Sequence, residues 1–205
     1  MNKSLQKPYI KMEIKEVVVA KVIAIANQKG GVGKTTTSVN LAASMGATDR
    51  RVLLIDLDPQ GNATMGCGVN KNDLELSLLD VMLLEATAEE AIVSTDHGFD
   101  ILGSNADLTA AEVELMKASQ REYRLQEILK PLQSKYDYVL IDCPPALNSL
   151  TLNALVASDS VLVPMQCEYY ALEGLASLMN TVEQIAEHLN PRLEIEGLVR
   201  TMFDP

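Results

Sequence analysis

The sequence predicts an α/β protein built on a mostly parallel, doubly wound sheet with helices on both faces. Short apolar runs alternate along the chain with longer segments of helical periodicity. The runs are apolar at successive positions, which is typical of strands that are buried on both faces of a sheet. The length of 205 residues suits one domain of this kind with a sizeable core.

The expected strands are the apolar runs, taken in chain order. Each is a short block rich in Val, Ile and Leu, residue types that favour a buried strand. The last one begins within LEIEGLVRTMF, and the chain ends soon afterwards. The strands are expected at residues 17–27, 51–58, 99–104, 136–144, 160–166 and from 193 onwards.

Helical spacing and capping signals predict the helices between these strands. Thr87 with Glu90, and Thr109 with Glu112, have the spacing of a capping box, which opens a helix. Between residues 121 and 133 the apolar side chains recur on one helical face. The remaining helices are expected at residues 34–45, 74–84, 150–157 and 172–189.

Composition indicates a soluble protein of a reducing compartment. The chain is 47% hydrophobic and 22% charged, its apolar runs are too short to span a bilayer, and its start lacks the pattern of a secretory signal. Three cysteines without CxxC spacing and two isolated histidines make neither a disulfide framework nor a zinc site. We therefore expect a cytoplasmic protein without a stable membrane anchor.

The charge is unevenly distributed along the chain. Residues 1–34 contain seven lysines and two glutamates, a net charge of +5, so the rest carries −16 of the total of −11. An acidic body argues against a broad nucleic-acid surface, because DNA affinity depends on neutralising phosphates. Residues 1–16 are expected to be a frayed tail rather than a basic arm for DNA or membrane. Met12 is an alternative natural start, and the domain is expected at 17–205.

The stretch NQKGGVGKTTT, residues 27–37, matches a phosphate-binding loop between a strand and a helix, with Gln28 in place of its first glycine. Glycines let successive backbone N–H groups turn towards an anion, and the helix dipole adds to this attraction. Lys34 would lie along the β- and γ-phosphates, and the Thr35 hydroxyl would bind Mg²⁺. The expected nucleotide-binding residues of the loop itself are Gly30, Gly31, Val32, Gly33, Lys34, Thr35 and Thr36.

Two further strands end in carboxylates. VLLID ends at Asp56 and YVLID at Asp142, and ligands of open α/β sheets bind at this edge. Asp142 would hold Mg²⁺ through a water molecule, as Walker-B acids do. Pro59 favours an extended backbone at Asp58, so Asp56 and Asp58 can share a face. One of them could support the metal ion while the other orients the attacking water.

KGGVGKTTT, LLIDLDPQGNAT, YDYVLIDCPPAL and VPMQCEYYALEGL together resemble the ParA/Soj family of chromosome and plasmid partition ATPases, which have a deviant Walker A loop. The resemblance covers nearly all of residues 17–205 and implies a P-loop NTPase fold with ATP and Mg²⁺. It implies that Asp58 is the hydrolytic aspartate. It also implies that Lys29 is the signature lysine, which reaches the partner's phosphates in an ATP-bound homodimer.

The resemblance further implies attachment to nucleoid DNA and stimulation of hydrolysis by a ParB-like protein. ParA-type proteins continue beyond the end of this chain, so we expect its C-terminal elements, its adenine contacts and its DNA-binding determinants to be missing here. The lack of a separate N-terminal DNA-reading domain favours the chromosomal or small-plasmid type. The alternatives are a MinD-like membrane-associated positioning ATPase and an inactive, truncated interaction module.

Overall fold

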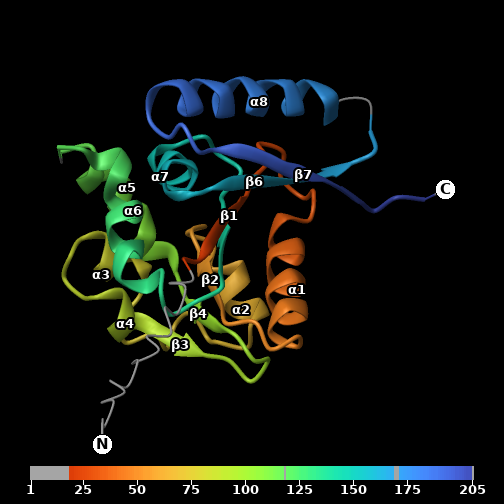
Figure 1. Ribbon diagram of the computed structural model, residues 1–205. Coiled ribbons are helices and arrows are strands. Elements are labelled where there is room, and N and C mark those ends of the chain that lie inside the picture. The colour runs from red at the N-terminus through yellow and green to blue at the C-terminus, as the bar shows by residue number, and fades with distance from the viewer. Residues whose placement is uncertain (1–18, 118, 169–170, 205) are drawn as a thin grey trace, which may run out of the picture.

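The computed structural model describes residues 19–117, 119–168 and 171–204 (Figure 1). The expectations for the tail at residues 1–16 and for a start at Met12 lie outside these residues. None of the helices within the described ranges has the length and apolar character that crossing a membrane requires.

Seven strands form one sheet in the order β3-β4-β2-β5-β1-β6-β7. All neighbouring pairs are parallel except β3 and β4, which are antiparallel. This confirms the predicted mostly parallel, doubly wound sheet. The strands are β1 Lys21–Ile25, β2 Val52–Asp56, β3 Ile92–Ser94, β4 Asp100–Leu102, β5 Tyr138–Asp142, β6 Ser160–Gln166 and β7 Glu194–Thr201.

Helices cover both faces of the sheet (Figure 1). Along β1, Ile23 and Ile25 pack with residues of α1 and α2, whereas Val22 and Ala24 join the larger core under α3, α5, α6, α7 and α8. This alternation follows from the two-residue period of a strand. The helices are α1 Lys34–Gly46, α2 Asn62–Gly66, α3 Leu78–Met82, α4 Ala88–Ala91, α5 Thr109–Leu115, α6 Arg124–Leu129, α7 Ser149–Ala157 and α8 Ala171–His188.

One of the two predicted capping boxes is present. The Glu90 carboxylate accepts hydrogen bonds from the backbone N–H and the hydroxyl of Thr87, and α4 follows. The prediction for Thr109 and Glu112 was wrong. Asn105 caps a 3₁₀ turn at Ala106–Leu108 that runs directly into α5, so Thr109 already lies inside the helical segment.

Two predicted helices are shorter than their sequence patterns suggested. The segment 121–133 forms α6 between two 3₁₀ turns, Arg121–Tyr123 and Lys130–Leu132, and Pro131 in the second turn cannot continue an α-helical hydrogen-bond ladder. The helix expected from residue 74 begins only at Leu78, because the Ser77 side chain caps it in a box with Asp80. The short elements α2 and β3 were not predicted.

The carboxyl edge of the sheet holds the features that matter for function. In the parallel register Asp142 at the end of β5 is level with Ile25 of β1 on one side and with Asp56 of β2 on the other. The glycine-rich loop that leaves β1 therefore begins at the same edge as both carboxylates, as the sequence predicted.

Candidate functional site

The glycine-rich loop joins β1 to α1 and leaves the amino end of that helix open. Gly31 and Gly33 have φ values of 73° and 85°, in the left-handed region that glycine adopts without strain. No side chain caps α1 at Gly33. The first backbone N–H groups of a helix lack partners within the helix and attract anions. The loop thus has the conformation of an anion cradle.

A pocket of about 540 Å³ opens over this loop. It joins the loop to the segments that follow β2, β5 and β7. Its lining residues are Gly30, Gly31, Gly33, Lys34, Thr35, Thr36, Asp58, Gln60, Asn62, Pro145 and Met202.

Lys34 is the buried cation of this pocket. The residue is 8% exposed, and its ammonium group donates a 3.1 Å hydrogen bond to the carbonyl oxygen of Lys29. Burial lowers the pKa of Lys34, and the nearby carboxylate of Asp142 opposes that shift. A cation held at the base of an anion cradle is suited to bind phosphate.

Asp56 and Asp58 have different surroundings although they are two residues apart. Asp56 is fully buried, and its Oδ2 accepts hydrogen bonds of 2.7 Å from both the backbone N–H and the hydroxyl of Thr64. Its Oδ1 accepts from the backbone N–H of Asp58 at 3.2 Å. Asp58 lines the pocket, and its carbonyl oxygen accepts a 2.7 Å hydrogen bond from Ser104. The buried carboxylate of Asp56 therefore holds the backbone that carries the half-buried Asp58.

Asp142 lies beneath the loop with one free oxygen. Its Oδ1 accepts a 2.8 Å hydrogen bond from the Ser38 hydroxyl of α1, whereas its Oδ2 is buried without a hydrogen-bond partner among the described residues. Burial raises the pKa of Asp142 to about 7, the Asp56 carboxylate adds to the rise, and the hydroxyls of Thr35 and Ser38 oppose it. An orphaned oxygen of this kind is suited to accept a hydrogen bond from a ligand or from water.

Lys29 points away from the pocket that Lys34 serves. Its side chain is 37% exposed, and its ammonium group pairs with the Glu168 carboxylate at 2.5 Å. Glu168 follows β6 and is 56% exposed. The two lysines of the loop thus face different surroundings, one buried at the phosphate cradle and one at the surface.

Comparison with known proteins identifies the family. The family model described as AAA domain matches residues 20–195. Chromosome partitioning protein ParA of Caulobacter vibrioides is 51% identical over 187 residues, which are 90% of this chain and 70% of that protein. Sporulation initiation inhibitor protein Soj of Bacillus subtilis is 52% identical over 185 residues, 90% of this chain and 73% of that protein. The chain belongs to the ParA family of ATPases.

Solved structures of similar fold agree with this assignment. Cobyrinic acid a,c-diamide synthase of Mycobacterium smegmatis with bound ADP and magnesium has a TM-score of 0.88 and 42% identity, covering 90% of this chain and 76% of that one. A Cyanothece McdA variant in complex with ATP has a TM-score of 0.83 and 26% identity, covering 88% and 70%. The resemblance to ParA/Soj proteins inferred from the four motifs is thereby confirmed.

Several residues of this ParA-family site were not singled out from the sequence. Ser38 stands one helical turn after Lys34, so the two side chains lie on the same face of α1. This spacing could have revealed Ser38 from the sequence. Thr64 and Ser104 come from separate segments and meet only in the fold, where the backbone N–H of Ser104 donates to the Thr64 hydroxyl at 3.0 Å. Gln166 donates to the carbonyl oxygen of Gly31 at 3.2 Å. These side chains support the loop and the turn at Asp58.

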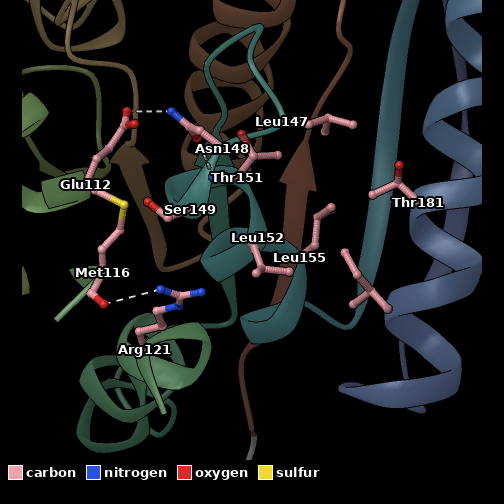
Figure 2. A pocket seen from close by; sticks show the side chains of 11 residues that line it. Glu112, Met116, Arg121, Leu147, Asn148, Ser149, Thr151, Leu152, Leu155 and Thr181 are labelled. Carbon is pink, nitrogen blue, oxygen red and sulfur yellow. Dashed lines mark hydrogen bonds between the residues drawn. The ribbon is translucent and has the colours of Figure 1, made fainter. Parts of the chain in front are cut away.

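A second cavity of this ParA-family chain lies beside α5, α7 and α8 and has a volume of about 490 Å³ (Figure 2). Its polar groups largely pair with each other. Asn148 donates to the Glu112 carboxylate, and Arg121 donates to the carbonyl oxygen of Met116 at 3.3 Å. We therefore assign the site to the loop pocket, which the buried cation Lys34 lines together with the Asp58 carboxylate.

The buried carboxyl group of Asp142 predicts a pH-dependent stability. Because its folded pKa of about 7 lies above the ordinary value of 3.8, the folded state binds the proton more tightly than the unfolded state does. The free energy of unfolding should therefore fall as pH rises from about 4 to above 7. Asp142→Asn should remove the part of this loss that Asp142 causes and stabilise the protein at pH 8 by on the order of 3 kcal/mol. The buried Asp56, whose pKa burial raises to about 6, keeps its own part of the loss.

Urea unfolding at pH 5 and pH 8, in EDTA and without nucleotide, measures this effect. The matched control is Asp96→Asn, which changes an exposed acid in the turn before β4 and should leave the pH dependence unaltered. An Asp142→Asn protein whose stability falls with pH as steeply as that of the parent would contradict the prediction.

Proposed function

We propose that this chain is a Mg²⁺-dependent ATP hydrolase that acts in chromosome or plasmid partition. The observation that carries the proposal is that Lys34, Thr35 and Asp58 line one pocket at the uncapped amino end of α1. The ParA and Soj relatives, at 51% and 52% identity, favour partition over the biosynthetic reaction named for the Mycobacterium smegmatis structure, at 42%.

In this proposal the loop binds the phosphates of ATP. The glycine N–H groups and the first N–H groups of α1 donate to the phosphate oxygens, and Lys34 places its charge along the β- and γ-phosphates. The Lys34 ammonium would then exchange the Lys29 carbonyl oxygen for a charged oxygen, which is the stronger acceptor.

Asp58 would orient the attacking water. Its carboxylate lines the same pocket as Lys34, and its backbone is held from both sides, by Asp56 at the N–H and by Ser104 at the carbonyl. A fixed backbone matters because a general base must be in hydrogen-bond reach of the water whose proton it takes. Asp56 would in this arrangement act through Asp58 and not by touching the reacting atoms.

The residues around the pocket fit a magnesium ion. Among the described residues, no group of three or more His, Cys, Asp or Glu side chains could enclose a metal ion. Mg²⁺ instead keeps several waters and binds phosphates and one or two protein oxygens. The Thr35 hydroxyl would be the direct ligand, and the orphaned Oδ2 of Asp142 would accept from a coordinated water. Bound Mg²⁺ would neutralise charge on the phosphate oxygens.

Asp56 has the least support among the three predicted metal residues, Thr35, Asp56 and Asp142. Both of its carboxylate oxygens already accept hydrogen bonds from the protein.

The finer parts of the proposal concern partners and location. ATP would drive formation of a homodimer in which Lys29 contacts the partner's phosphates. The dimer would attach non-specifically to DNA in the cytoplasm, and a ParB-like protein would stimulate hydrolysis. Lys29 is not among the residues that line the loop pocket, and its side chain is 37% exposed, which supports the cross-subunit contact.

Binding of a fluorescent ATP analogue to the purified chain with Mg²⁺ tests the core of the proposal. Lys34→Ala should weaken binding by about 10- to 100-fold, the usual effect of losing a hydrogen bond from a charged group. Lys130→Ala removes a cation in the 3₁₀ turn after α6 that pairs only with Glu127 among the described residues, and it should bind as the parent does. Equal affinity of the parent and the Lys34 variant would overturn the assignment of the site.

Co-sedimentation of the protein with DNA or with liposomes, each with ATP and Mg²⁺, tests the cellular role. Partition predicts sedimentation with DNA. Sedimentation with liposomes alone would favour the MinD-like alternative, and ATP binding without turnover would favour an interaction module.

A further inference from the structure

The surface pair between Lys29 and Glu168 joins two parts of the molecule that are far apart in sequence. Lys29 belongs to the loop after β1, and Glu168 follows the end of β6. Their charged atoms are 2.5 Å apart, so the pair has formed within one subunit. A lysine held in this way is not free to reach a group on another molecule.

The Glu168 segment contacts the loop at a second point. Gln166, two residues before Glu168, donates to the carbonyl oxygen of Gly31 at 3.2 Å. On the neighbouring helix α8, the Ser177 hydroxyl accepts a 3.0 Å hydrogen bond from Gln28. The residues before and after Lys29 are thus tied to the same β6–α8 region, which sets the direction of the Lys29 side chain.

We propose that Glu168 is a positioning residue that holds Lys29 in its own subunit until nucleotide-dependent dimerisation offers the lysine a better acceptor. This inference rests on the proposed function, since the competing acceptor is the phosphate chain of the partner's ATP. A carboxylate carries one negative charge, whereas the triphosphate carries several, so the lysine exchanges partners only when the second subunit arrives with nucleotide.

The strength of the pair suits a reversible restraint. Exposed ion pairs change an equilibrium by about two- to fivefold. Each subunit of a symmetric dimer has to break one such pair, so the two effects multiply. Glu168→Gln should therefore strengthen ATP-dependent dimerisation by roughly tenfold.

The first measurement concerns the ion pair itself and does not depend on ATP. Labelling of lysines with an amine-reactive reagent, read by mass spectrometry on the nucleotide-free protein, reports how freely the Lys29 amine reacts. Glu168→Gln should increase labelling at Lys29 several-fold. Glu127→Gln breaks a comparable surface pair, in which Glu127 of α6 meets Lys130 of the following 3₁₀ turn at 2.6 Å, and should leave Lys29 labelling unchanged.

The second measurement is the dimerisation constant, from analytical ultracentrifugation with a non-hydrolysable ATP analogue and Mg²⁺. Glu168→Gln should dimerise at lower protein concentration than the parent, and Glu168→Asp, which keeps the charge, should lie between the two. Increased Lys29 labelling with unchanged dimerisation would overturn the positioning role. A parent protein that neither binds nucleotide nor dimerises would instead refute the proposed function, and unchanged labelling would show that the pair does not hold Lys29 in solution.

Discussion

Replacing Lys29 with alanine is expected to lower ATP turnover by about 10³- to 10⁵-fold, the effect of losing a cationic finger supplied by a second subunit. This corresponds to roughly 4 to 7 kcal/mol of activation free energy. The variant should still bind ATP as a monomer, because Lys34 and the open end of α1 form the cradle in the same subunit and Lys29 points to the surface.

Phosphate release and nucleotide-dependent dimerisation, measured on the same samples, check this prediction. Dimerisation should be lost together with hydrolysis, while the affinity of the monomer for an ATP analogue stays near that of the parent. Lys117→Ala, which removes a surface lysine paired with Glu114, is the matched control. If Lys29→Ala weakened monomer binding as much as Lys34→Ala does, Lys29 would be a local phosphate ligand and the cross-subunit role would be wrong.

The placement of two carboxylates at the carboxyl edge of the sheet could be predicted, because it follows from where the strands end. Asp56 and Asp142 each close an apolar run, and parallel strands bring such ends to one edge, where the register places the two acids side by side. The conformation of the loop followed in the same way from its glycines, since few other residues adopt positive φ without strain.

What the sequence could not predict depends on contacts between distant segments. An extended backbone suggested that Asp56 and Asp58 face one site, yet Asp56 turns to Thr64 of α2, a short helix that has no clear signal of its own. The Glu168 partner of Lys29 is 139 residues away. The capping box at Thr109 failed for a local reason instead, because Asn105 offered an earlier cap.

Replacing Asp58 with alanine is expected to lower ATP turnover by about 10²- to 10⁴-fold, the usual effect of losing a positioned general base. The substitution should leave the turn after β2 in place. The hydrogen bonds to Asp56 and Ser104 use the backbone N–H and carbonyl of Asp58, and these groups remain in the variant. Nucleotide binding should therefore persist, and the ATP-bound dimer should accumulate because its hydrolysis is slow.

The Asp58→Asn variant distinguishes a catalytic role of the Asp58 carboxylate from a structural role in the turn. The Asp58 Oδ1 also accepts a 2.9 Å hydrogen bond from the backbone N–H of Gln60, and an asparagine side chain can still accept it but cannot take a proton from water. Single-turnover hydrolysis and size-exclusion chromatography with ATP should show both variants equally slow and equally dimeric. If Asp58→Asn turned over ATP as fast as the parent, Asp58 would have only a structural role in the turn. If Asp58→Ala turned over ATP as fast as the parent, Asp58 would have no role in hydrolysis.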